Sequence, residues 1–178
     1  MHSPEVISSF ITIIILGLDP ALPSYREASA AESLTRESAK MVEVIHTNGG
    51  ACGIMSKVGH FDFYVNGGSS QSHVKSPFLD FNLRSPLLKL TTFSNFRSHI
   101  LAFDFYIQSI TGKKGFYGRR CRYGMKFISE DDCRGRLVKM GGIRVNHQSQ
   151  SFELPDIKEG SYYVKTNVEK PYDLGLDF

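Results

Sequence analysis

The chain has 178 residues, a formal net charge of +3 and a hydrophobic fraction of 41%. This length suits one ordinary domain or a piece of a larger one, and the hydrophobic content excludes a mainly disordered protein. The small positive charge does not by itself indicate nucleic-acid binding, and the absence of heptads, tracts and fixed-period repeats excludes coiled coils and solenoids.

The first element is an apolar run from Val6 to Leu18. It is shorter than the roughly 20 residues that a membrane-spanning helix needs. The β-branched residues at 11–15 favour a buried strand, and the alternative is a signal peptide, although the leading segment carries Glu5 and no Lys or Arg. Asp19 and Pro20 follow the run, so the strand ends on a carboxylate where α/β proteins place working groups.

Further elements follow in chain order. Residues 41–46 and 59–65 read as short strands that each end in a double-glycine turn, whereas residues 69–96 show only weak periodicity. The apolar side chains of Ile100, Phe103, Ile107 and Ile110 are spaced by three and four residues, which predicts a helix from about His99 to Ile110. A last strand is expected at 161–166.

Asp19 and His99 are the candidate chemical pair. A carboxylate at the end of a strand and a histidine at the start of a helix can meet in space as the orienting acid and the general base of a hydrolase. The alternative is coincidence, because six histidines in the chain make such a pairing easy to find.

Three cysteines lack the C-x-x-C spacing of structural zinc sites. Cys121 and Cys133 lie twelve residues apart in a Gly- and Arg-rich stretch with turn character, which favours a local bridge and leaves Cys52 free. The alternative is three free, buried thiols in a cytosolic protein.

Several motifs together resemble the pancreatic (neutral) lipase family, particularly its arthropod-type members. They are G-L-D-P-A at 17–21, V-E-V-I-H-T-N-G-G at 42–50, G-H-F-D-F-Y-V-N-G-G at 59–68 with Gln71, and Y-Y-V-K-T-N at 162–167. The resemblance runs in the right order over residues 10–175. It implies a lipase-type α/β-hydrolase fold and the hydrolysis of carboxylic esters of lipids, triacylglycerols or phospholipids, outside the cell.

The resemblance also implies roles for single residues. Asp19 matches the acid of the catalytic triad and His99 matches its base, while His46 and His60 match strand and turn positions with structural roles. Residues 72–98 match the lid, a mobile loop that shields the active site until a lipid interface is present. The alternative for that segment is a poorly ordered loop.

Some family features are missing. The cysteines that tether the lid in vertebrate members would fall near Val74 and Arg97, so the lid is expected to be untethered. The calcium carboxylates would align with Ala30, Thr35 and Ser38, so we expect no metal site, and the family implies no organic cofactor. Cys121 and Cys133 match a second family bridge.

The nucleophile is the largest departure. Family order is Ser, Asp, His, with the serine on a G-x-S-x-G elbow, and the sequence contains no such elbow. Ser3 lies in a poor context and too close to Asp19. We therefore expect residues 1–178 to form a single partial α/β-hydrolase domain that lacks the N-terminal strands and the nucleophile elbow, either as a truncated gene product or as a non-catalytic remnant. Alone it is expected to be inactive.

The stretch from Lys113 to Lys126 combines basic and aromatic residues, a composition typical of surfaces that bind an anionic partner. Its functional interpretation is an anionic lipid surface or glycan rather than nucleic acid, and its alternative is a solvated loop around the bridge. The basic residues are Lys113, Lys114, Arg119, Arg120, Arg122 and Lys126. Besides an extracellular lipid ester hydrolase, two hypotheses therefore stay open: a non-catalytic secreted lipid- or glycan-binding protein, and a cytosolic fragment without its own function.

Overall fold

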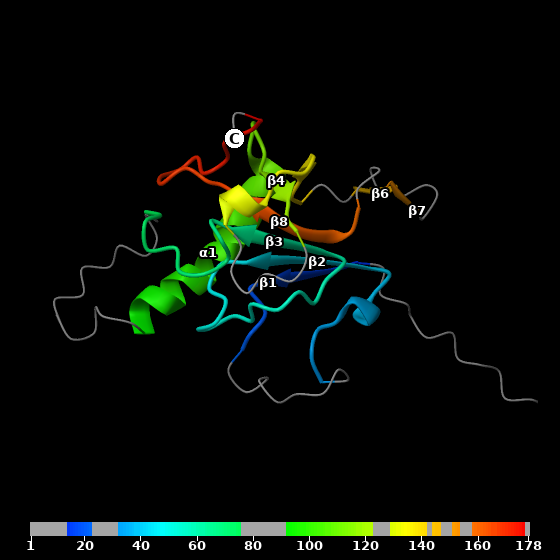
Figure 1. Cartoon of the computed structure of the whole chain (residues 1–178), viewed down its shortest axis with the longest axis horizontal. Coiled ribbons are helices and arrows are strands. Elements are labelled where there is room, and N and C mark those ends of the chain that lie inside the picture. Colours follow the sequence, from blue (N-terminus) through cyan, green and yellow to red (C-terminus); the bar gives the residue numbers. More distant parts are fainter. Residues whose placement is uncertain are drawn as a thin grey trace, which may run out of the picture.

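The computed structural model describes residues 14–22, 32–75, 92–122, 129–141, 144–146, 151–153 and 158–176. Within these ranges, a six-stranded mixed sheet and a long helix, α1 (Thr92–Thr111), form the body of the molecule (Figure 1). The sheet has the strand order β1 (Ile14–Leu18), β2 (Met41–His46), β3 (Phe61–Val65), β8 (Gly160–Val164), β4 (Tyr117–Arg120) and β5 (Leu137–Lys139).

Minor elements complete the description. β6 (Arg144–Asn146) and β7 (Ser151–Glu153) pair antiparallel in a separate two-stranded sheet. Two 3-10 helices, η1 (Arg36–Ser38) and η2 (Glu130–Asp132), lie in connections.

The four strands β1, β2, β3 and β8 run parallel to one another. All six residues of β2 and all five of β3 are buried, as expected for central strands of a parallel sheet that is covered on both faces. In the register, Leu18 of β1 lies beside Ile45 of β2. The residues that follow these two strands, Asp19 and Thr47, are therefore brought to the same edge of the sheet.

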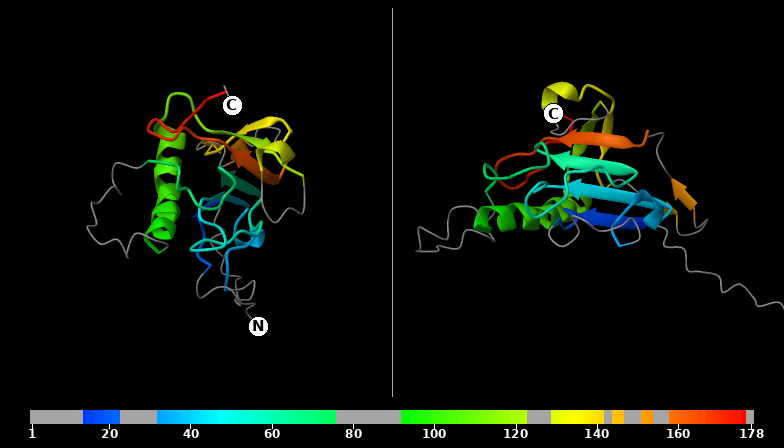
Figure 2. Two further views of the ribbon diagram at one scale, coloured as in Figure 1. Left: turned by 60° about the vertical axis from the view of Figure 1, so that its left-hand side comes forward. Right: turned by 60° about the horizontal axis from the view of Figure 1, so that its bottom comes forward.

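Helix α1 lies on one side of the sheet and crosses β1 and β2 (Figure 2). Its sheet-facing residues Leu101, Ala102 and Phe105 are at most 1% exposed. Phe105 packs edge-on against Phe116 and Tyr172, which joins the helix to the segments near β4 and the C-terminal end. This packing fixes the position of the helix, and with it the position of His99.

The helix differs from the sequence-based prediction in two ways. It begins at Thr92 rather than near His99, so it includes the last residues of the predicted lid. The periodic residues that predicted it are not the buried ones: Phe103 is 56% exposed and Ile110 is 58% exposed. The spacing is correct for a helix, but the neighbouring stripe, which contains Phe105, faces the sheet.

The predicted strands at 41–46, 59–65 and 161–166 are confirmed to within one or two residues at their ends. The first strand is confirmed for Ile14–Leu18, and residues 6–13 lie outside the described ranges. Strands β4 to β7 were not predicted, because each has only three or four residues. The disulfide between Cys121 and Cys133 is confirmed, and Cys52 is free.

Candidate active site

Asp19 ends β1 in an unusual backbone conformation. Its φ of +46° lies in the left-handed region, which non-glycine residues adopt at a cost. The backbone N–H of Asp19 donates to the carbonyl of Ile45 at 2.7 Å and so holds this turn. The side chain is completely buried. Its Oδ1 accepts hydrogen bonds from the backbone N–H groups of Thr47 at 2.8 Å and Asn48 at 2.9 Å.

His99 lies on α1, eighty residues further along the chain, and meets Asp19. The distance from its Nδ1 to Oδ2 of Asp19 is 2.7 Å. A carboxylate accepts at this position, so Nδ1 donates and the neutral ring presents an unprotonated Nε2. The His99 side chain is 28% exposed, whereas that of Asp19 is fully buried. The arrangement suits a general base whose tautomer is fixed by a buried acid.

The loop after β2 shapes the surroundings of Asp19. A Cβ added to Gly53 would collide with the carboxylate of Asp19, so only glycine allows the loop to approach this closely. Asn48 ties the loop together, because its Oδ1 accepts from the N–H of Cys52 at 2.9 Å. Its Nδ2 lies 3.5 Å from Oδ1 of Asn95, which links the loop to α1 one turn before His99.

A second network joins the loop to the helix from another direction. The side-chain amide of Gln71 is buried and donates to the carbonyls of Thr47 at 3.2 Å and Val65 at 2.8 Å. The backbone N–H of Gln71 donates to Oγ of Ser98, the neighbour of His99, at 2.9 Å. Sequence reasoning named Gln71 only as part of a motif, and it assigned no site role to Thr47, Asn48 or Gly53.

Cys52 lies near the same carboxylate. Burial, and then the negative charge of Asp19, raise the pKa of the Cys52 thiol. The thiol is half-buried and its backbone belongs to the loop that holds Asp19. It is therefore kept in the protonated, weakly nucleophilic form.

The ends of the predicted lid meet at the positions of the missing family cysteines. A guanidinium N–H of Arg97 donates to the carbonyl of Val74. Together with the Gln71 to Ser98 bond, this contact joins the two ends without a disulfide. The intervening residues 76–91 lie outside the described ranges, so the lid at 72–98 stays a prediction.

The other predicted structural and metal-related residues have local roles. His60 accepts the N–H of Val42 at its Nδ1, and His46 contacts Asp62. Thr35 and Ser38 cap η1 through their hydroxyl groups, and Ala30 lies outside the described ranges. Within those ranges, no three His, Cys, Asp or Glu side chains converge as metal ligands.

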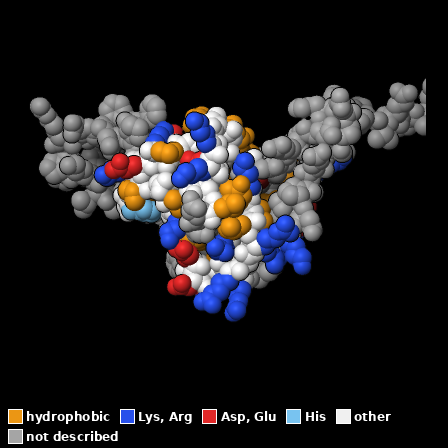
Figure 3. All heavy atoms as spheres, turned by 90° about the horizontal axis from the view of Figure 1, so that it is seen from above, with side chains coloured by type: hydrophobic (Ala, Val, Ile, Leu, Met, Phe, Trp, Pro, Cys, Tyr) orange, Lys and Arg blue, Asp and Glu red, His pale blue; other side chains and the backbone are white. Residues whose placement is uncertain are grey.

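The basic residues do not gather in one place. Lys113 and Lys114 follow α1, whereas Arg119 and Arg120 are neighbours on β4, so their side chains point to opposite faces of the sheet. Figure 3 shows Lys and Arg side chains spread among hydrophobic ones over the face that it views. Lys126 lies outside the described residues.

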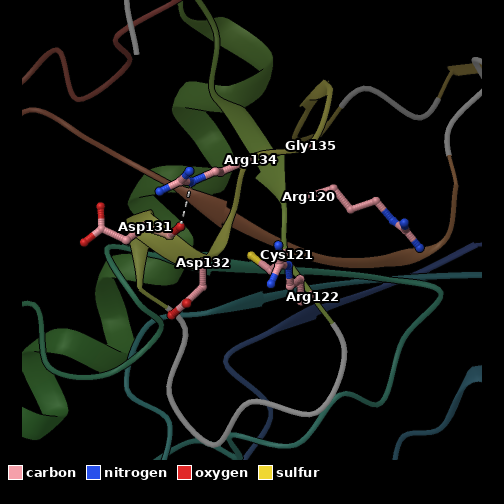
Figure 4. Close-up of a pocket in the computed structure, with 7 residues that line it drawn as sticks. All are labelled: Arg120, Cys121, Arg122, Asp131, Asp132, Arg134 and Gly135. Atoms are coloured by element: carbon pink, nitrogen blue, oxygen red, sulfur yellow. Dashed lines mark hydrogen bonds between the residues drawn. The ribbon is translucent and has the colours of Figure 1, made fainter.

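An open hollow of about 660 Å³ lies beside the disulfide. In Figure 4 the guanidinium groups of Arg120 and Arg134 point in opposite directions, and Arg134 Nε donates to the carbonyl of Asp131. The hollow is lined by Arg120, Cys121, Arg122, Asp131, Asp132, Arg134 and Gly135. Its mixed charge and diverging arginines make it a weaker candidate for chemistry than the Asp19 and His99 pair.

Among the described residues, none of the helices combines the length and the hydropathy of a bilayer-spanning segment.

Comparisons with known proteins agree with the site. A family model described as Lipase matches residues 11–172. The chain is 31% identical over 169 residues to phospholipase A1 member A of Rattus norvegicus, which covers 89% of this chain and 33% of that protein. It is 30% identical over 169 residues to pancreatic lipase-related protein 3 of Homo sapiens, which covers 89% of this chain and 36% of that protein. It is 33% identical over 125 residues to pancreatic triacylglycerol lipase of Cavia porcellus, and this match covers 65% of this chain and 26% of that protein. The chain thus spans about a third of the length of the curated relatives it matches first.

Proposed function

Because this chain belongs to the lipase family, we propose that it carries the acid and the base of a serine-dependent ester hydrolase that acts on lipids. Residues 1–178 then form one partial domain of that enzyme. Asp19 is the acid and His99 is the base. The observation that carries the proposal is the 2.7 Å contact between His99 Nδ1 and the buried Oδ2 of Asp19.

The geometry supports a defined sequence of proton transfers. Asp19 is held by two backbone N–H groups, so its carboxylate stays oriented when His99 becomes charged. Nε2 of His99 takes the proton from the hydroxyl of a serine as the oxygen attacks the ester carbonyl. It then returns that proton to the leaving alcohol, and a water molecule repeats the cycle to release the acid.

The serine is not supplied by a G-x-S-x-G elbow in these 178 residues. We therefore propose that the chain by itself does not hydrolyse esters. The acid and base alone lack the covalent route that a nucleophile provides.

The relatives' names, which specify a phospholipase A1 and a triacylglycerol lipase, support a proposal for the substrate class. Both reactions break carboxylic esters of glycerolipids, so we propose a glycerolipid ester as the substrate and lipid breakdown as the role. The disulfide between Cys121 and Cys133 supports an extracellular location, because disulfides persist in oxidising compartments.

The test begins with the 5′ end of the transcript. If it encodes a G-x-S-x-G elbow in frame, the longer protein is assayed on phosphatidylcholine vesicles and on a triacylglycerol emulsion. His99→Ala is expected to lower kcat by about 10⁴-fold or more, and Asp19→Asn by about 10⁴-fold, since the wrong tautomer of His99 then forms. Glu37→Gln, which changes an exposed carboxylate of η1, is the control. Full activity in His99→Ala would refute the assignment.

The second candidate is a secreted, non-catalytic lipid- or glycan-binding protein. Lys113 and Lys114, which are neighbours after α1 and are both exposed, favour an anionic partner over a neutral one. Binding of the chain to heparin and to phosphatidylserine vesicles, compared with Lys113→Glu/Lys114→Glu, separates a glycan from a lipid surface. If no upstream elbow exists and no ester is cleaved, this candidate replaces the first.

A further inference from the structure

A second buried histidine and carboxylate pair lies behind the first. Nε2 of His46, the last residue of β2, is 2.9 Å from Oδ1 of Asp62 on β3, and both side chains are completely buried. The other ring nitrogen, Nδ1, lies 2.9 Å from the carbonyl oxygen of Ile54. The triad chemistry uses neither of these residues.

Counting donors and acceptors fixes the protons of this pair. A carbonyl oxygen only accepts hydrogen bonds, so Nδ1 of His46 must carry a proton toward Ile54. The contact between Nε2 and Asp62 needs one further proton, on either the nitrogen or the oxygen. The Asp62 carboxylate also accepts the backbone N–H groups of Val58 at 3.0 Å and of Gly59 at 3.1 Å, and such donors favour its ionised form. The further proton therefore belongs on Nε2.

We propose that His46 is protonated on both ring nitrogens in the folded protein and forms a buried ion pair with Asp62 that positions Asp19. The inference rests on the proposed function only where it treats Asp19 as the catalytic acid. His46 and Asp62 touch no reacting atom and are positioning residues.

The loop after β2 connects the two pairs. Its first two N–H groups, from Thr47 and Asn48, hold Asp19, and its later part is held by the ion pair. His46 fixes the carbonyl of Ile54, and Asp62 fixes the N–H groups of residues 58 and 59. Gly53, which packs against the carboxylate of Asp19, lies between Asn48 and the anchor at Ile54. Loss of the contacts at His46 and Asp62 is therefore expected to let the loop after β2, which holds the Asp19 carboxylate, move.

Among the described contacts of the ring, the groups other than Asp62 carry no charge. Tyr64 of β3 stacks on His46 with ring centroids 4.3 Å apart and an angle of 8° between the planes. Burial, and then the negative charge of Asp62, raise the pKa of Tyr64, so the phenol stays neutral. Its hydroxyl donates to the carbonyl of Met55 at 3.1 Å. Gly68, in the turn after β3, lies against Cβ of His46. Asp62 is thus the charge that His46 faces among these contacts.

The first test reads the ring nitrogens directly. Nitrogen-15 NMR of the whole chain at about pH 8, where an ordinary histidine is neutral, distinguishes a doubly protonated ring from a neutral one. We expect both nitrogens of His46 to give protonated signals, because each ring nitrogen faces an acceptor. A neutral His46 ring in the unmodified chain would overturn the ion pair, and this result needs no variant to fold.

Asp62→Asn removes the negative charge that faces His46 and keeps a side chain of nearly the same shape. The amide that replaces the carboxylate keeps an oxygen at the position of Oδ2 for the N–H of Gly59. Its nitrogen takes the place of Oδ1 and donates to Nε2 of His46, so the ring becomes neutral in nearly the same place and the N–H of Val58 loses its acceptor. We expect the Nε2 signal of His46 to move to the unprotonated position. Asp104→Asn, which changes a carboxylate in a partly exposed ion pair between α1 and Lys170, is the control and leaves His46 unchanged.

The positioning role has its own readouts. In the chain, Asp62→Asn is expected to shift the Nδ1–H signal of His99, which reports its bond to Asp19, and Asp104→Asn is not. In the longer protein with a serine elbow, Asp62→Asn is expected to lower kcat about ten- to a hundredfold with little change in KM. If Asp62→Asn makes His46 neutral but leaves the Nδ1–H signal of His99 unchanged, the positioning role is overturned. If His99→Ala keeps full activity while His46 is doubly protonated, the proposed function fails and the ion pair stands.

Discussion

Glu43 lies in the middle of β2 and is the one acidic side chain of that strand. It is 3% exposed, and its neighbours in the register are Leu16 of β1 and Phe61 of β3. Its Oε1 accepts the N–H of Gly141 at 2.8 Å. Burial raises the pKa of Glu43 from 4.5 to about 7, because the hydrogen bond from Gly141 compensates only part of the lost hydration.

This difference makes stability depend on pH. The unfolded chain releases the Glu43 proton near pH 4.5, whereas the folded protein keeps it until about pH 7. The stabilisation is therefore fully present below pH 4.5 and is lost as the pH rises through about 7. At about 1.4 kcal/mol for each unit of pKa, the free energy of unfolding falls by about 3 kcal/mol across this range on account of Glu43.

Glu43→Gln tests the magnitude. Glutamine keeps the oxygen that accepts from Gly141, has nearly the same shape and cannot ionise. The variant is expected to match the natural chain in urea unfolding near pH 4.5 and to exceed it by about 3 kcal/mol near pH 8. Glu169→Gln, at an exposed carboxylate, is the control. Parallel pH curves for Glu43→Gln and the natural chain would refute the argument.

Other changes probe the site, the bridge and the helix. Gly53→Ala places a methyl group against Asp19 and is expected to destabilise the fold by about 1–3 kcal/mol and to shift the His99 Nδ1–H signal; an unchanged spectrum would contradict the close approach. Replacing both Cys121 and Cys133 by Ser removes a bridge that closes a short loop and is expected to lower the free energy of unfolding by about 3 kcal/mol in urea titrations. Phe103→Ser, on the exposed stripe of α1, is expected to change it by less than about 0.5 kcal/mol, whereas Phe105→Ala is expected to lower it by about 3–5 kcal/mol; equal effects would mean that the buried face is misassigned.

Much of the fold could be predicted because the central strands are recognisable from their local sequence. The strands at 41–46 and 59–65 are short apolar runs that end in glycine turns, and a parallel strand buried on both faces needs such a run. The short strands β4 and β5 carry no such signal. β4 pairs with β8, from a segment about forty residues further along the chain, and β5 pairs with β4, so local sequence does not reveal either pairing.

The sequence by itself determined the residue types at the site and the order in which they occur. Asp19 after a strand and His99 on a helix were visible as candidates, and the Cys121 and Cys133 spacing indicated their bridge. Tertiary structure decided which face of α1 is buried, since Leu101 and Phe105 fit the sheet while the regular stripe of Phe103 does not. A helical period states that one face is apolar, but only packing against a particular sheet selects the face that is buried.

Tertiary structure also decided how the acid is held. The loop that donates the N–H groups of Thr47 and Asn48 to Asp19 and brings Gly53 against it reads locally as nothing more than a turn. Its role follows from the parallel register, which sets the ends of β1 and β2 side by side, and from anchors at His46 and Asp62. Such contacts join residues far apart in the chain, and their geometry exists only once the sheet has formed.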